Sequence, residues 1–242
     1  MDTSPNNPYL SRDNSHLTLE QIAAETQRFM AKVYTYMAIA LGITGVVSYI
    51  TASSEGILQL LYGNGIGIWV LLFAQLGIVW YLSARINKMT AQNAMLWYVI
   101  YSVLTGLVLS FIFIVYTSGS IASTFFITAG TFAAMSILGY TTKTDLTKMG
   151  SILYMALIGL VIASVVNIFL NNSTLYWITT YAGVLIFVGL TAYDTQKIKN
   201  MNIIGNEGTD EDKKEAIIGA LTLYLDFINL FLYLLRLFGN RK

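Results

Sequence analysis

The chain contains no cysteine, which excludes disulfides, thiolate catalysis and cysteine-ligated zinc or iron–sulfur sites. Proline is almost absent as well. Pro5 and Pro8 are the only two, so no proline ring interrupts a helix further along the chain. Charged residues make up only 11% of the sequence, against about 25% in a typical soluble domain. The formal net charge of +1 argues against a nucleic-acid partner.

Apolar residues are abundant instead, at 55% of the 242 residues. A bilayer core needs about 20 apolar residues in helical form. Six runs meet this requirement and a seventh follows near the C-terminus: 33–52, 66–84, 94–116, 121–140, 150–170, 175–193 and 216–238. Short loops connect most of them, which favours antiparallel packing of neighbouring helices. The sequence therefore predicts an all-α integral membrane protein with seven transmembrane helices.

The first 28 residues have a different character. MDTSPNNPYLSRDNSH is polar and rich in turn formers, so we expect a loosely held segment. Thr18 and Gln21 have the spacing of a capping box, which predicts a short amphipathic helix leading into the first span. Acidic residues come first and no small-residue cleavage site follows the apolar run, so the segment does not match a secretory signal. We expect a tail over residues 1–28 and one seven-helix domain over residues 29–242.

The Lys and Arg residues alternate between connections. Counted from the N-terminal tail through the loops that follow each of the six spans, they number 3, 0, 2, 0, 2, 0 and 4. Because positive loops stay inside, the N-terminus is predicted to be cytoplasmic. Arg236, Arg241 and Lys242 lie outside if the seventh segment crosses fully and inside if it turns back, and both alternatives stay open. The short basic loops and the lack of an organelle signal favour a prokaryotic plasma (inner) membrane.

An acidic residue interrupts the seventh run, at Asp226 in LTLYLDFINLF. Steps of three and four residues place it on one helical stripe of polar or small residues, namely Gly219, Thr222, Asp226, Asn229, Tyr233 and Arg236. An ionised Asp at mid-bilayer costs at least about 2.5–3.5 kcal/mol. We therefore expect the stripe to face other helices or a wet cavity. A purely structural role, with a neutral Asp226 hydrogen-bonded to a neighbour, remains the alternative.

A second acid, Asp194, follows the sixth run in GLTAYDTQKIKN. Lys197 comes three residues later, so Asp194 alone is typical of a solvated pair at the interface. Residues 209–212 look like the cap and acidic first turn of the seventh helix, which would run antiparallel to the sixth and bring the two acids to similar depths. Two carboxylates about 4 Å apart repel by about 4 kcal/mol at an effective dielectric near 20. Such a pair is expected to share one proton and to separate when both groups ionise.

Three segments resemble the transmembrane Bax-inhibitor family: TAYDTQKIK, ALTLYLDFINLFLYLLRLFG and TTKTDL (Thr141 to Leu146). The resemblance covers the chain from about residue 28 onward, with the same spacing of apolar runs. It implies a seven-helix fold in which the C-terminal helix lies at the centre of the other six. It also implies a pH-sensitive calcium leak channel with Asp194 and Asp226 as the sensor pair. Arg85, at the end of the second run, fits the implied latch for the first acid, and an interfacial anchor is its alternative role.

Calcium would then be the permeant ion, and no cofactor is expected. A calcium storage site takes roughly 6–8 oxygen ligands, more than two carboxylates supply. Weak, transient contact with Asp194 and Asp226 suits a leak, because a permeant ion must also leave. The candidate pore-lining residues near this pair are Thr191, Thr222, Asn229 and Tyr233.

Two other classes of function stay open at this point. Intramembrane aspartyl proteases also use two aspartates on adjacent helices, but their second Asp lies in GxGD and here the context is LYLD, so we expect no enzyme. The main alternative is a non-transporting regulator that binds a membrane protease or another membrane protein, as some members of the resembled family are thought to do. No motif indicates an oligomeric state.

Overall fold

The structure, a computed structural model, describes residues 18–63 and 65–242. Within these ranges the regular elements are all helical, and the one β-type pairing is an isolated bridge between Tyr116 and Arg241. Of the tail expected over residues 1–28, residues 1–17 lie outside the described residues. Thr18 caps the first helix and forms the predicted capping box with Gln21, which confirms that interpretation.

Seven helical segments of the described chain are long and apolar enough to cross a membrane. They are α1 (Leu19–Ala52), α3 (Ile66–Arg85), α4 (Ala91–Leu109) with α5 (Phe111–Val115), α6 (Ser118–Thr141), α7 (Thr147–Leu170), α8 (Ser173–Met201) and α9 (Asp210–Phe238). The prediction of an all-α membrane protein with seven spans is confirmed.

Two details of the first half differ from the prediction. The expected loop between the first two spans contains a short helix, α2 (Glu55–Tyr62). The third run, predicted as continuous over 94–116, is interrupted at Ser110. There the Ser110 hydroxyl donates to the Leu107 carbonyl (2.7 Å), and the Tyr62 hydroxyl donates to the Val108 carbonyl (2.9 Å). Hydroxyl donors that engage helix carbonyls compete with backbone bonding, and these contacts lie where α4 ends and α5 begins.

The chain divides into two compact units. The first unit consists of the residues up to Ser110 together with Ile198–Leu221. Within it, α4 packs against both α1 and α3. Gly106 permits the close approach of α4 to α1, because a Cβ at this position would lie 2.8 Å from the Thr44 carbonyl oxygen. The Thr44 hydroxyl donates to the Ser102 carbonyl across the same interface (2.9 Å).

The connection between α8 and α9 is shorter than the sequence indicated, because both helices extend beyond their apolar runs and leave only residues 202–209 between them. The start of α1 holds this loop: Arg28 donates to both Glu207 carboxylate oxygens (2.6 and 2.8 Å). These hydrogen bonds lower the pKa of Glu207. Lys32 pairs with the buried Asp212 in the first turn of α9. The Thr209 hydroxyl accepts from the Asp212 N–H, so the predicted cap of the last helix is present.

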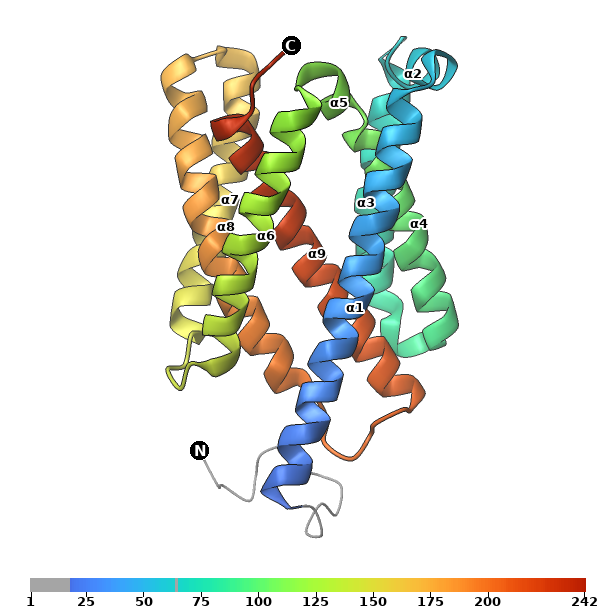
Figure 1. Cartoon of the computed structure of the whole chain (residues 1–242), viewed down its shortest axis with the longest axis vertical. Coiled ribbons are helices and arrows are strands. Elements are labelled where there is room, and N and C mark those ends of the chain that lie inside the picture. The colour runs from blue at the N-terminus through green and yellow to red at the C-terminus, as the bar shows by residue number, and fades with distance from the viewer. Residues whose placement is uncertain (1–17, 64) are drawn as a thin grey trace. The chain divides into compact units, whose positions relative to one another are not determined.

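The second unit consists of Phe111–Lys197 and Thr222–Lys242. In it, α6, α7, α8 and the C-terminal half of α9 form a bundle (Figure 1). A Cβ at Gly139 of α6 would collide with the Ala192 carbonyl of α8, and a Cβ at Gly183 of α8 would lie 2.5 Å from the Tyr233 ring of α9. Small residues thus allow the helix backbones to approach closely, as is common between transmembrane helices.

The last helix is the most buried of the seven. In its most apolar stretch 61% of the residues are buried, compared with 44% in the next most buried helices, α4 with α5 and α8. Such burial suits a helix that carries polar side chains away from lipid. Its location at the centre of the other six helices stays a prediction.

The C-terminal residues bear on whether the seventh segment crosses the membrane fully or turns back, which the count of Lys and Arg left open. α9 is one continuous helix of 29 residues, about 43 Å long, and it does not turn back. Beyond it, the Asn240 N–H donates to the Ser120 hydroxyl, and the Lys242 N–H donates to the Val115 carbonyl, both at 2.9 Å. The C-terminus therefore lies at the end of the second unit that carries the charge-free α5–α6 turn. This arrangement favours a full crossing by the seventh span.

The orientation of the chain in the membrane remains a prediction, and cysteine labelling tests it. In this cysteine-free sequence, Ser54→Cys and Ser173→Cys are each expected to react with a membrane-impermeant maleimide applied from outside, because their loops lack Lys and Arg. Lys143→Cys serves as the matched inside control and should react only after permeabilisation. Labelling of Ser54→Cys or Ser173→Cys solely from the cytoplasmic side would contradict the predicted topology.

Candidate functional site

The sixth span extends beyond its predicted end at residue 193, because α8 continues to Met201. Asp194 is therefore inside a helix, about two turns from its end, rather than at its terminus. Gln196 connects this part of α8 to the α6–α7 loop through two hydrogen bonds. Its side-chain oxygen accepts from the Leu146 N–H (2.8 Å), and its side-chain NH₂ group donates to the Thr144 carbonyl (2.9 Å). The TTKTDL segment thus helps to fix the helix that carries the first acid.

The second unit brings Asp194 and Asp226 together. Their side chains are 1% and 5% exposed, and the two carboxyl groups lie close enough for a side-chain hydrogen bond. The alternative of a solvated Asp194–Lys197 surface pair does not hold, because Asp194 is buried and the exposed Lys197 ammonium lies over the Tyr154 and Tyr193 rings (6.0 and 5.9 Å).

A tyrosine that the sequence analysis missed completes the site. The Tyr154 hydroxyl of α7 donates to both oxygens of Asp194, at 3.0 and 3.2 Å. In contrast, one oxygen of Asp226 is buried and has no hydrogen-bond partner within the described chain. Two buried carboxyl groups side by side, one of them incompletely hydrogen-bonded, disfavour a state in which both are ionised. The arrangement can hold one proton between two acids.

The four candidate pore-lining residues differ in their surroundings. The buried Thr191 donates to the Phe187 carbonyl of its own helix (2.7 Å), and Asn229 donates to the Leu225 carbonyl of its own helix (2.8 Å). Tyr233 stacks on the Phe187 ring, with 5.8 Å between centroids. Thr191 and Thr222 each lie within about one helical turn of an acid of the pair. Tyr233 contributes instead to the packing of α9 against α8.

Arg85 is the last residue of α3, and its side chain is exposed. It belongs to the first unit, whereas Asp194 belongs to the second. Its role as a latch for Asp194 stays a prediction.

Resident metal binding has little support from side chains. The described residues contain no group of three or more His, Cys, Asp or Glu side chains that could hold an ion. The acid pair alone supplies two carboxyl groups, far fewer oxygens than the roughly 6–8 of a calcium storage site.

Sequence comparison identifies the family. The family model described as Inhibitor of apoptosis-promoting Bax1 matches residues 26–242. The chain belongs to the Bax inhibitor family. This family member is 53% identical to the inner membrane protein YbhL of Escherichia coli over 226 residues, which cover 93% of the chain and 97% of YbhL. It is 50% identical to an uncharacterized protein of Rickettsia prowazekii over 217 residues (89% and 91% of the two chains). An uncharacterized protein of Borreliella burgdorferi is 46% identical over 215 residues (89% and 93%).

Proposed function

We propose that this Bax inhibitor family protein is a pH-sensitive calcium leak channel of a prokaryotic inner membrane, gated by Asp194 and Asp226. The observation that carries the proposal is the burial of two contacting carboxyl groups between α8 and α9, beside apolar helices. Buried acids within a membrane span are costly and commonly mark ion or proton pathways.

The gating step follows from the charge of the pair. With one shared proton, the two carboxyl groups attract each other and hold α8 and α9 together. When that proton leaves, two negative charges repel by about 4 kcal/mol at 4 Å and an effective dielectric of 20. Separation then opens a hydrated, negatively charged passage in which calcium makes weak contacts and moves on. The pair titrates as a unit, so the response belongs to neither acid alone.

Calcium flux into liposomes that contain only the purified protein tests this function. Flux that varies with pH is expected, because the pair changes its charge when the shared proton leaves. A folded protein that carries no calcium at any pH would contradict the channel. That outcome would favour a non-transporting regulator that binds a membrane protease or another membrane protein.

The latch is tested with Arg85→Ala. If Arg85 stabilises the ionised form of Asp194, its removal makes ionisation harder and shifts the pH midpoint of flux upward. Lys88→Ala is the control, because it removes a positive charge only three residues further along the chain. An unchanged midpoint in Arg85→Ala would identify Arg85 as an interfacial anchor.

Tyr154→Phe tests the hydroxyl that donates to Asp194. The hydrogen bonds from Tyr154 favour an ionised carboxylate, so their loss is expected to shift the midpoint of the flux response upward without abolishing it. Tyr193→Phe is a matched control, since its ring packs edge-on against Tyr154 at 6.0 Å. Identical midpoints in wild type and Tyr154→Phe would show that the tyrosine only packs.

A further inference from the structure

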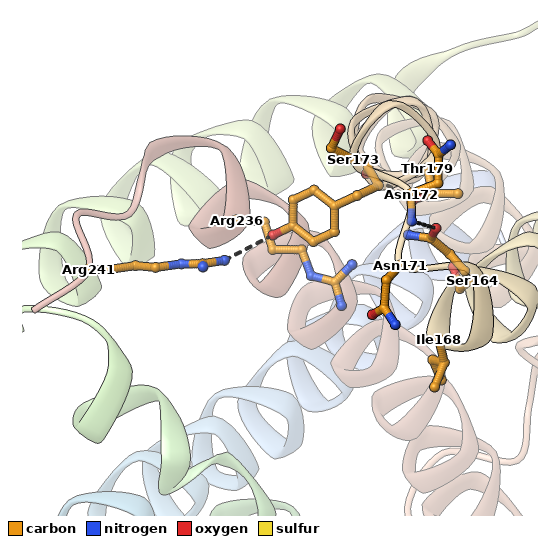
Figure 2. Close-up of a pocket in the computed structure, with 10 residues that line it drawn as sticks. Ser164, Ile168, Asn171, Asn172, Ser173, Thr179, Arg236 and Arg241 are labelled. Atoms are coloured by element: carbon orange, nitrogen blue, oxygen red, sulfur yellow. Dashed lines mark hydrogen bonds between the residues drawn. The ribbon is translucent and has the colours of Figure 1, made fainter.

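A cleft of roughly 510 Å³, with two arginines and several neutral polar residues in its lining, lies in the second unit, where α9 ends. α7, α8 and the turn between them supply Asn167, Asn171, Asn172 and Ser173, and the C-terminal segment supplies Arg236 and Arg241 (Figure 2). Arg236 is ten residues beyond Asp226 along α9, which is about 15 Å of helix. The cleft is therefore separate from the acid pair.

Both arginines are held by aromatic groups. The Arg236 guanidinium lies over the rings of Tyr176 and Tyr233, at 5.6 and 5.3 Å from their centroids. Arg241 donates a hydrogen bond to the Tyr176 hydroxyl (3.3 Å), as Figure 2 shows. A guanidinium stacked on a ring keeps its N–H donors in the plane of the group, where they can reach an anion. The side chains are thus oriented without consuming their full donor capacity.

The positive charge in this cleft is not neutralised by nearby acids. The segments that form it contain no Asp or Glu: the sequence has none between Asp145 and Asp194, and none after Asp226. Among the ion pairs of the described residues, none involves Arg236 or Arg241. Asn and Ser side chains add neutral hydrogen-bonding groups to the lining. The chemistry of the cleft is complementary to an oxyanion.

An apolar rim places the cleft at the edge of the lipid-facing surface. The last three residues of α7 have large apolar side chains, and all three are exposed: Ile168 (68%), Phe169 (81%) and Leu170 (64%). Ile168 also lines the cleft itself. A cationic cleft bordered by exposed apolar residues matches the boundary between acyl chains and water, where phospholipid phosphates lie.

We propose that this cleft is a phosphate-binding site at the membrane surface, with Arg236 and Arg241 as its cationic ligands. The planar guanidinium fork matches phosphate oxygens two at a time, which favours phosphate over a halide. An anionic phospholipid headgroup and a free phosphate ion share this chemistry, and the experiment below distinguishes them.

The lipid arm compares retained phospholipids by native mass spectrometry of the full-length protein. We expect the wild type to retain phosphatidylglycerol in preference to phosphatidylcholine. Arg236→Gln/Arg241→Gln should weaken the retention of phosphatidylglycerol at least about tenfold, because this variant loses charge-assisted hydrogen bonds to the phosphate. Lys143→Gln/Lys148→Gln removes the same charge from the α6–α7 loop and the first turn of α7 and should keep the preference. Arg236→Lys/Arg241→Lys keeps both positive charges but lacks the planar guanidinium groups, so we expect lipid retention between that of the wild type and that of the glutamine variant. If the glutamine variant does not fold, this lysine variant replaces it in the comparison.

The free-ion arm uses lipid-depleted Ser173→Cys protein and inorganic phosphate as the probe. Phosphate is expected to slow maleimide labelling of this cleft residue relative to chloride at equal ionic strength. An effect of phosphate without a lipid preference assigns a free anion, and a lipid preference without a phosphate effect assigns a headgroup. Wild type with neither property overturns the proposal. The proposal is also overturned if Arg236→Gln/Arg241→Gln and Lys143→Gln/Lys148→Gln lose the same amount of lipid retention. Overall charge, and not the cleft, would then explain the binding.

Discussion

Asp226→Asn is expected to give a folded protein whose calcium flux no longer shows the pH response of the wild type. Asparagine keeps the shape of the side chain and removes its titration. Because Asp194 and Asp226 contact each other, Asp194→Asn should flatten the same response. The double variant should resemble the single ones, since changes within one coupled unit do not add.

The control for this experiment is the third acid of the second unit. Asp145 is exposed and accepts hydrogen bonds from the N–H and hydroxyl of Thr147, contacts that an asparagine oxygen can keep. Asp145→Asn should therefore retain the wild-type pH profile. A normal profile in Asp226→Asn, with folding verified, would reduce Asp226 to a packing residue.

Gly139→Ala is expected to lower stability by about 1–3 kcal/mol, the usual cost of forcing extra volume into a packed interface. The added methyl group would collide with the Ala192 carbonyl, which is backbone and cannot rotate away. Since Ala192 lies two residues before Asp194, the displaced α8 should also disturb the acid pair and its flux.

Gly130→Ala provides a matched control in the same helix. No heavy atom lies within 4 Å of a Cβ at Gly130, so alanine there should be neutral or slightly stabilising. Thermal unfolding of both variants in one detergent measures the difference. Equal melting temperatures would contradict the close contact between α6 and α8.

Hydropathy predicted the spans well because each one needs a long apolar run, but it misplaced the ends of helices. The segment after residue 193 is polar, which is typical of a connection, yet it continues α8, and Gln196 within it bonds to the α6–α7 loop. Similarly, Tyr62, which is remote in sequence, contacts the Val108 carbonyl and the Ser110 hydroxyl at the break between α4 and α5. Such boundaries arise from tertiary contacts that no local pattern reports.

The candidate site could be predicted only in part, because it also depends on tertiary contacts. An acid in an apolar run is conspicuous, so Asp226 could be found from the sequence alone. Tyr154 lies among apolar residues of α7 and resembles any membrane-facing aromatic residue until its contact with Asp194 is known. In the same way, Gly130 and Gly139 look equivalent in the sequence, and only the structure shows which one touches a neighbouring backbone.

The order of the helices along the chain has a consequence for biosynthesis. α9 is synthesised after helices that depend on it: Asp210 accepts from the Ala91 N–H at the start of α4 (3.0 Å), and Asp212 pairs with Lys32 of α1. Until α9 inserts, those groups and Asp194 lack their final partners. A nascent chain stalled before residue 210 would leave the buried Asp194 carboxyl group without its neighbour Asp226.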